Sequence, residues 1–224
     1  MAEIISISSF QKAREQTLFA MHVATFLAAA HKVALVDFLP QTHILENFIA
    51  KRHFFNLKNN QNLPVPVYFE NTKNLLSKIS PDFDFAVLDD ASGSFLESAD
   101  IVLTLVIDEA AADLLCDKDS YLSKTIWQAK MERAKKGKNA FKHVLIPCDV
   151  LNIEKINQLR KNASLLGYTV APSLAQNEAY HACLKDGVTV LDKDGPYLLK
   201  EFNQNDFFAR RNLKQILECV WFEK

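Results

Sequence analysis

The sequence predicts an α/β protein in which helices cover both faces of a mostly parallel, twisted central sheet. Short apolar runs rich in β-branched residues alternate with segments whose apolar residues recur at helical spacing. Hairpin signals between these runs are few, so helical crossovers are expected to join parallel strands. The 224 residues contain no internal repeat and no long linker, which predicts one three-layer α/β/α domain spanning residues 1–224.

Six apolar runs are typical of buried strands, and one further run is a candidate strand. The expected strands are 4–7, 32–38, 83–89, 100–107, 142–146 and 168–170, with 188–191 as the candidate seventh. Their largely apolar character predicts burial on both sides, as in a sheet that carries helices on each face.

Helical periodicity accounts for much of the remaining chain. The expected helices are 15–30, 41–52, 71–79, 119–138, 153–166 and 206–221. Gly167 directly follows one of them and is expected to cap its carboxyl end. The segment 56–66 is polar, contains Asn and Pro, and is predicted to be a loop.

Composition and charge exclude several classes of protein. The formal net charge of −1 argues against a surface that is basic throughout. No apolar run reaches the roughly 18 residues needed to span a bilayer, and the first residues lack a secretory signal pattern. The four cysteines are far apart and lack zinc-ligand spacing, so they are expected to be reduced, buried thiols of a cytoplasmic protein.

The carboxyl ends of the first strands are the positions at which such a sheet binds ligands. Residues 8–17, between the first strand and the first helix, occupy the position of a phosphate-binding loop. Glycine is absent from the first 92 residues, and Gln16 stands where a phosphate-binding lysine would be. Glu15 adds a negative charge that would repel a triphosphate. Thr17 stands where a magnesium-binding hydroxyl would be, although it could equally satisfy free amides at the start of the helix.

Asp37 and Asp89 end the second and third expected strands. A carboxylate at this edge of the sheet commonly orients a magnesium ion or its water ligands. The alternative is that each residue only caps a helix or solvates a strand end. Because both follow strands of the same sheet in this order, a shared site is the more specific interpretation.

Several stretches resemble the ParA/MinD superfamily of deviant P-loop ATPases, and most closely its MipZ family. In the first 110 residues these are the threonine that opens the first helix, then VDFLPQ, FDFAVLD and ADIVLTLVI. In the second half they are YLSKTIWQAKMERAKKGKNAFKHVLIP, LLGYTVAPSLAQNEAYHACLKDGVTVLD and FFARRNLKQIL. The resemblance spans nearly the whole chain and implies the P-loop NTPase fold.

The resemblance also implies a phosphate loop of the form KGGxGK[ST], from which this sequence departs. The signature lysine falls on Gln11, the following glycine on Lys12 and the second lysine on Gln16, whereas Thr17 is kept. The second of the family's two acidic residues after the second strand falls on Leu39. The departures concern residues that bind the triphosphate.

By resemblance, the vestigial nucleotide and magnesium site comprises Lys12, Gln16, Thr17, Asp37 and Asp89. No catalytic residue, no metal and no bound cofactor are expected, and ATP with Mg²⁺ is the cofactor if the site still works. Both lysine positions are lost, so the ATP-driven dimerisation of the family is also in question, and a monomer or weak homodimer is expected.

Two basic segments are candidate surfaces for DNA or a protein partner. Lys155, Arg160 and Lys161 lie on a helix that contributes to non-specific DNA binding in similar proteins. The stretch 130–138 is basic as well, but a solvated helix end with cations near its carboxyl terminus is the commoner explanation of such a stretch. Trp127 and Trp221 are interpreted as packing residues.

Three functions follow from these observations. The first is a MipZ- or ParA-like spatial regulator of cell division or of chromosome or plasmid partitioning. It would act as a degenerate ATPase through protein contacts, with ParB-like and FtsZ-like partners implied by the resemblance, weak non-specific DNA binding and no membrane association. The second is a working Mg-ATP-dependent ATPase of this type that dimerises on ATP. The third is an α/β enzyme that has reused the strand-end cleft for another ligand.

Overall fold

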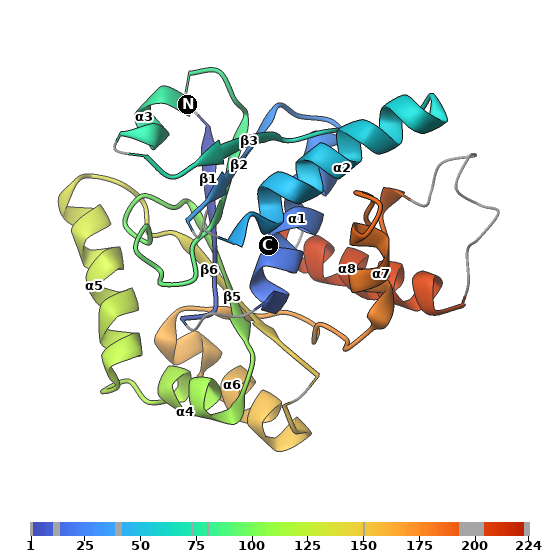
Figure 1. The fold of residues 1–224 in the computed structure, drawn as a ribbon. Coiled ribbons are helices and arrows are strands. Elements are labelled where there is room, and N and C mark those ends of the chain that lie inside the picture. Colours follow the sequence, from blue (N-terminus) through green and yellow to red (C-terminus); the bar gives the residue numbers. More distant parts are fainter. Residues whose placement is uncertain are drawn as a thin grey trace.

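The computed structural model describes residues 2–10, 14–38, 42–72, 74–79, 81–149, 151–192 and 204–221. They form a seven-stranded sheet in which every neighbouring pair is parallel, in the order β3-β2-β4-β1-β5-β6-β7 (Figure 1). The strands are β1 (Glu3–Ser8), β2 (Val33–Asp37), β3 (Val67–Glu70), β4 (Phe85–Asp89), β5 (Ile101–Val106), β6 (Lys142–Pro147) and β7 (Thr169–Val170). The predicted α/β fold with a mostly parallel sheet is confirmed.

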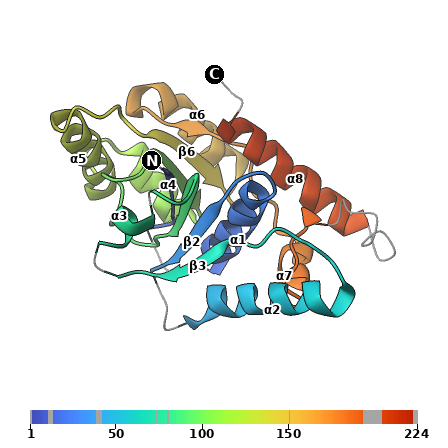
Figure 2. The same ribbon diagram turned by 90° about the horizontal axis from the view of Figure 1, so that it is seen from above.

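Helices cover both faces of this sheet. They are α1 (Arg14–Ala28), α2 (Ile44–Asn59), α3 (Leu75–Ile79), α4 (Glu109–Cys116), α5 (Tyr121–Lys135), α6 (Ile153–Leu166), α7 (Glu178–Leu184) and α8 (Gln204–Trp221). The core on one face joins the sheet to α1, α2, α7 and α8, whereas α3 to α6 pack on the other (Figure 2). Gly167 caps α6 in the left-handed conformation, as predicted.

The strands are buried because they lie between two apolar layers. Ile5 and Ile7 of β1 belong to the core beneath α1 and α8, and Val102 and Val106 of β5 belong to the core beneath α4 to α6. All six residues of β5 are buried, which explains why the sequence shows a continuous apolar run rather than alternation.

Several predicted elements differ from the observed ones: the helix predicted over 71–79 is confined to Leu75–Ile79, and α4 and α7 were not predicted. The candidate strand 188–191 is wrong: Val188 and Val190 are buried, but the segment is coil and turn. The Asp192 carboxylate accepts hydrogen bonds from the Thr189 backbone and hydroxyl, which bends the chain. The seventh strand is instead β3, a short and partly exposed edge strand. Finally, α2 extends to Asn59 and thus into the predicted loop, because no residue stops it before Asn60 adopts the left-handed conformation.

A buried ion pair joins α2 to the segment that follows α7. The Arg52 side chain is fully buried, and its two terminal nitrogens each lie 2.7 Å from an oxygen of Asp192. Arg52 also donates to the carbonyls of Pro64 and Gly187. Gly187 has φ of 73°, and a Cβ there would lie 2.3 Å from the Arg52 amide nitrogen, so only glycine permits this approach.

Candidate functional site

The predicted site residues gather where β1, β2 and β4 end. The register pairs Asp89 with Asp37 on one side and with Ile7 on the other, so the two predicted carboxylates lie on adjacent strands. Asp37 and Asp89 are each 1% exposed, and Asp90 is fully buried. The prediction that these strand ends share one edge of the sheet is confirmed.

A closed hydrogen-bond network links Asp89 to the start of α1. The Thr17 hydroxyl donates to Asp89 Oδ2 at 2.7 Å, and Gln16 Nε2 donates to Asp89 Oδ1 at 2.5 Å. The other end of the Gln16 amide, Oε1, accepts from the Ser9 hydroxyl at 2.7 Å. Both carboxylate oxygens of Asp89 therefore have a protein donor. We call these four residues the Asp89 network.

Burial makes the negative charge of Asp89 costly. Burial raises the pKa of the Asp89 carboxyl, the nearby carboxylates of Asp37 and Asp90 add smaller contributions in the same direction, and the resulting pKa is about 6. The hydrogen bonds from Thr17 and Gln16 work in the opposite direction. The donors that oppose burial are thus neutral groups, whereas a phosphate site would use a lysine ammonium.

The two other carboxylates at this edge have different surroundings. Asp90 accepts hydrogen bonds from the Ser92 hydroxyl at 2.9 Å and from the Phe95 backbone at 2.8 Å. These bonds fix the turn after β4 and give Asp90 a structural role. The Tyr68 hydroxyl donates to Asp37 at 3.5 Å, a long contact, and burial together with Asp37 raises the pKa of Tyr68. A magnesium-orienting role for Asp37 stays a prediction.

The described residues do not fit a magnesium-bound triphosphate in this arrangement. The neutral Gln16 occupies the position of the phosphate-binding lysine, and its amide is bound to Asp89 and Ser9. No group of three or more His, Cys, Asp or Glu side chains in the described part of the chain is arranged to hold a metal. Lys12 lies outside the described residues.

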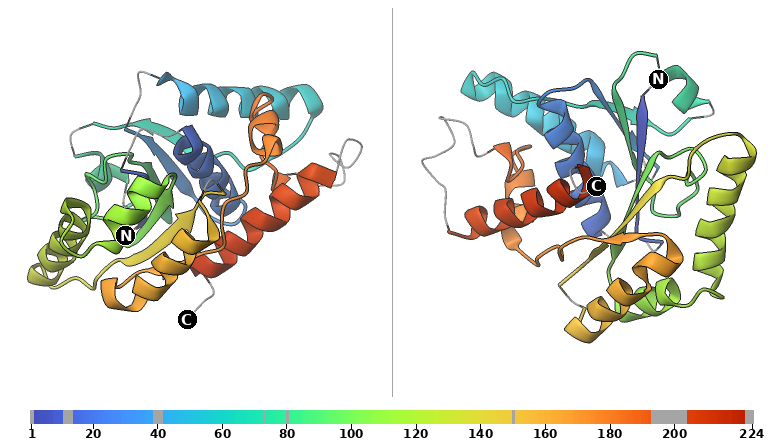
Figure 3. Two further views of the ribbon diagram at one scale, coloured as in Figure 1. Left: turned by 90° about the horizontal axis from the view of Figure 1, so that it is seen from below. Right: turned by 180° about the vertical axis from the view of Figure 1, so that it is seen from behind.

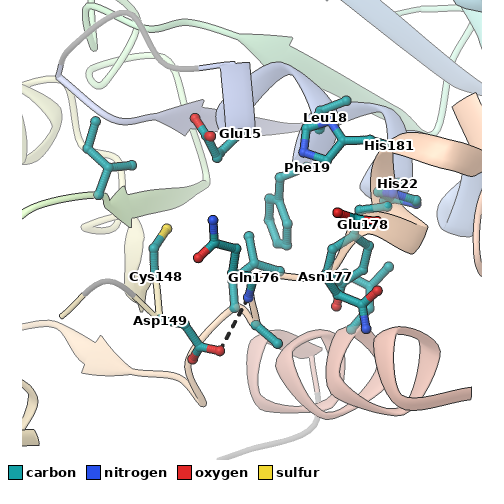
Figure 4. Close-up of a pocket in the computed structure, with 15 residues that line it drawn as sticks. Glu15, Leu18, Phe19, His22, Cys148, Asp149, Gln176, Asn177, Glu178 and His181 are labelled. Atoms are coloured by element: carbon teal, nitrogen blue, oxygen red, sulfur yellow. Dashed lines mark hydrogen bonds between the residues drawn. The ribbon is translucent and has the colours of Figure 1, made fainter. Parts of the chain in front are cut away.

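A cavity of about 430 Å³ opens beside the Asp89 network, at the ends of β5 and β6 and between α1, α7 and α8 (Figure 4). Apolar side chains, among them Phe19 and Leu213, line its interior. Carboxylates reach it from three separate elements, at Glu15, Asp149 and Glu178. Among the described lining residues there is no Lys or Arg, so the cavity suits a neutral or cationic ligand better than a triphosphate.

The cavity lacks an activated nucleophile. Burial raises the pKa of the Cys148 thiol to about 12, so Cys148 stays protonated at neutral pH. Burial also lowers the pKa of His22, which is 2% exposed on α1, to about 4. These shifts favour binding over covalent catalysis at this position.

The predicted DNA or partner surface is only partly free. Arg160 and Lys161 are exposed on α6, whereas the ammonium of Lys155 is paired with Asp113 of α4. In the stretch 130–138, residues 134–138 are exposed, which agrees with a solvated helix end, whereas Arg133 is buried and bound to Asp100. Two lysines of the same stretch are paired with glutamates, namely Lys135 with Glu132 and Lys136 with Glu97.

The two tryptophans differ from each other. Trp221 is partly buried and lies against Phe26, with 6.1 Å between ring centroids, which agrees with a packing role. Trp127 is 61% exposed on α5, so its interpretation as a packing residue is wrong. Ser9 was not singled out in the sequence, where its only signal is a hydroxyl at the end of a strand.

Comparison with known proteins places these observations in a family. A family model described as "ATPase MipZ" matches residues 73–222. The matched span contains Asp89, whereas Gln16, Thr17 and Asp37 precede it. No curated protein matches the chain.

Three proteins with solved structures have a similar fold. An ATP complex of a McdA variant from Cyanothece has a TM-score of 0.61 and 15% identity, covering 100% of this chain and 98% of the other. MinD from Aquifex aeolicus has a TM-score of 0.58 and 14% identity, with the same coverage. A putative plasmid partition protein from Borrelia burgdorferi bound to AMPPNP has a TM-score of 0.51 and 16% identity, covering 97% and 98%. At these identities the similarity shows the fold alone.

Proposed function

The chain belongs to the MipZ family of ATPases. From this premise we propose that it is a spatial regulator of cell division or of chromosome or plasmid partitioning. We propose further that it works through protein contacts and does not hydrolyse ATP. The observation that supports the absence of ATP hydrolysis is the Asp89 network, in which Gln16 and Thr17 donate hydrogen bonds to both oxygens of the buried carboxylate. Proteins of the ParB-like and FtsZ-like classes are the partners that family membership favours. We propose a cytoplasmic location, and none of the described helices is long and apolar enough to cross a membrane.

The energy needed to reopen the site supports this proposal. Binding Mg-ATP would require Gln16 to release Asp89, and a hydrogen bond to a charged group contributes about 1.5–3 kcal/mol. Breaking this bond weakens affinity by roughly 10- to 100-fold. The glycine amides and the lysine that would offset this cost are absent from the sequence.

The test is a calorimetric titration of the full chain with ATP and magnesium, with sedimentation velocity on the same samples. We expect no heat of binding and no ATP-dependent change in sedimentation at about 1 mM ATP. A Gln16→Lys variant provides the comparison, because it returns a cation to the phosphate position. Micromolar binding of Mg-ATP by the unmodified chain would overturn the proposal.

A working ATPase is the second candidate. Its support is that Thr17, Asp37 and Asp89 are retained at one sheet edge, and that proteins of this fold have been solved with ATP or AMPPNP. It predicts that Gln16→Lys leaves turnover unchanged or lowers it. If Gln16→Lys instead creates nucleotide binding that the unmodified chain lacks, this candidate fails.

A ligand-binding or catalytic role of the strand-end cavity is the third candidate. The supporting observation is that about 430 Å³ remains open beside the closed Asp89 network. Thermal unfolding in the presence of neutral and cationic small molecules tests it, with Asp149→Asn as the matched variant. A stabilisation that persists unchanged in Asp149→Asn would count against binding in this cavity.

A further inference from the structure

A groove between α5 and α6 lies on the face of the sheet opposite to the strand-end cavity. It has a volume of about 630 Å³ and is walled by α5 residues such as Ile126 and Trp127 and by Leu165 and Leu166 of α6. We call it the α5–α6 groove. None of its lining residues belongs to the Asp89 network or to the strand-end cavity.

The groove exists because α4 is short. α4 packs against both α5 and α6, but its eight residues extend about 12 Å, compared with about 22 Å for the fifteen residues of α5. Leu115 and Cys116, at the end of α4, close one end of the groove. Figure 3 shows α4, α5 and α6 together on one side of the sheet. The space between the two longer helices is therefore covered over only part of their length.

Aromatic rings that contact one another lie at the floor of the groove. The His143 ring lies edge-on between the rings of Phe141 and Tyr168, with 6.0 Å between centroids on each side. His143 Nε2 lies 3.0 Å from the Thr104 hydroxyl, and Nδ1 has no hydrogen-bond partner in the described part of the chain. Lys130 donates to the Gly167 carbonyl at 2.6 Å and so ties α5 to the end of α6.

Large apolar side chains on both walls face solvent. Trp127 on α5 is 61% exposed and Leu165 on α6 is 83% exposed. Tryptophans that line a concave apolar site are the residues most often found to dominate the energy of protein interfaces. Their placement on facing helices provides two anchor positions for one occupant.

The charged residues among those that line the groove have a single sign. Lys118, Lys124 and Lys130 line it, and no Asp or Glu is present among its described lining residues. Neither Lys118 nor Lys124 takes part in an ion pair within the described ranges. This local excess contrasts with the net charge of −1 for the whole chain and favours an acidic occupant.

We propose that the α5–α6 groove is the docking site for an amphipathic helix of a partner protein, with its apolar side between Trp127 and Leu165 and acidic residues facing Lys118 and Lys124. A helix fits better than an added strand, because the groove presents side chains and no free strand edge. The groove identifies a surface for the protein contacts of the proposed function and rests on that part of it. It does not depend on whether ATP binds.

The first measurement is an unbiased selection. A display library of helix-forming peptides is panned on the immobilised full chain, with and without Mg-ATP. We expect enriched peptides to carry apolar residues at i, i+3, i+4 and i+7 flanked by Asp or Glu. Enrichment of basic peptides, or of no helical pattern, would overturn the proposal. A consensus that changes with Mg-ATP would instead count against the nucleotide-independent function and leave the groove proposal standing.

The second measurement locates the binding. In a Trp221→Phe background, Trp127 is the remaining tryptophan, so its fluorescence reports on the groove. We expect the selected peptide to shift this fluorescence, and Lys118→Glu with Lys124→Glu to weaken binding by about tenfold or more. Lys138→Glu, on an exposed residue beyond the end of α5, is the matched control and should leave binding unchanged. Equal losses in both variants would overturn the assignment.

Other occupants are outcomes of the same series. Leu165→Ser changes an exposed residue and is not expected to affect folding. If the chain alone self-associates and Leu165→Ser abolishes this, the occupant is a second copy. If a 20-base-pair DNA duplex binds with the same dependence on Lys118 and Lys124 and displaces the peptide, the surface binds nucleic acid. Either result would overturn the proposal.

Discussion

Replacing Asp89 by Asn tests whether Asp89 belongs to a closed structural network or to a metal site. The Asn side chain has the same shape, and a flip of the Gln16 amide would let Gln16 accept from it and donate to Ser9. Thr17 can still donate to the remaining oxygen. Every member of the network therefore keeps a partner, whereas the buried charge is removed.

The magnitude follows from the pKa of Asp89, which is about 6 in the folded protein and near its ordinary value of about 4 when unfolded. Because the pKa of Asp89 is raised in the folded protein, its contribution to the free energy of unfolding is fully present below about pH 4. This contribution is lost as the pH rises through 6. Two pKa units correspond to about 2–3 kcal/mol. The stability of Asp89→Asn relative to the unmodified chain should rise by this amount between pH 4 and 7.5.

The assay is urea unfolding of both proteins at half-unit intervals of pH. In thermal melts the same difference appears as a relative gain of about 5–10 °C for a domain of this size. Thr17→Val is the matched variant: it removes one hydrogen bond that lowers the pKa of Asp89, so the loss of stability with rising pH should become steeper. Parallel pH profiles for Asp89→Asn and the unmodified chain would refute the reasoning, since they would show that Asp89 ionises in the folded protein at its ordinary pKa.

Two further predictions concern the core. Arg52→Met leaves the Asp192 carboxylate buried without its cation and should lower the free energy of unfolding in urea by about 3–5 kcal/mol. Adding Asp192→Asn removes the buried charge and should recover part of this stability. If the double variant recovers none of it, the ion-pair argument is contradicted. The pKa of His22 is lowered to about 4 in the folded protein. Its contribution to the free energy of unfolding is therefore present above about pH 6.5 and is lost as the pH falls through 4. His22→Leu should therefore reduce the loss of stability between pH 7 and 4 by on the order of 3 kcal/mol, and an unchanged acid profile would contradict it.

The edge of the sheet at which the site lies could be predicted from the sequence. Parallel strands joined by helices end on one side, so Asp37 and Asp89 were expected at the same edge of the sheet. That their strands are neighbours is a result of the strand order. The direct bonds from Gln16 and Thr17 to Asp89 could not be predicted, because residue spacing does not determine which of several available partners a side chain selects. The sequence indicated a missing lysine, and the structure shows what replaces it.

The failures have a common physical cause in tertiary packing. The segment 188–191 has the composition of a strand, but its neighbour Asp192 binds Arg52, 140 positions earlier, and the chain turns there. Trp127 was expected to be packed because most tryptophans are, but the short α4 leaves the wall of the groove uncovered. In both cases the outcome depends on a distant element whose length or charge no local pattern reports.

The ion pair between Arg52 and Asp192 also bears on how sequences related to this chain would change over time. The family match begins at residue 73, so the arginine lies before the matched span and the aspartate within it. A substitution at either position alone leaves a buried charge, so the two positions should change together. Covariation with position 192 therefore identifies the correct alignment of α2 in relatives whose loops have diverged beyond recognition.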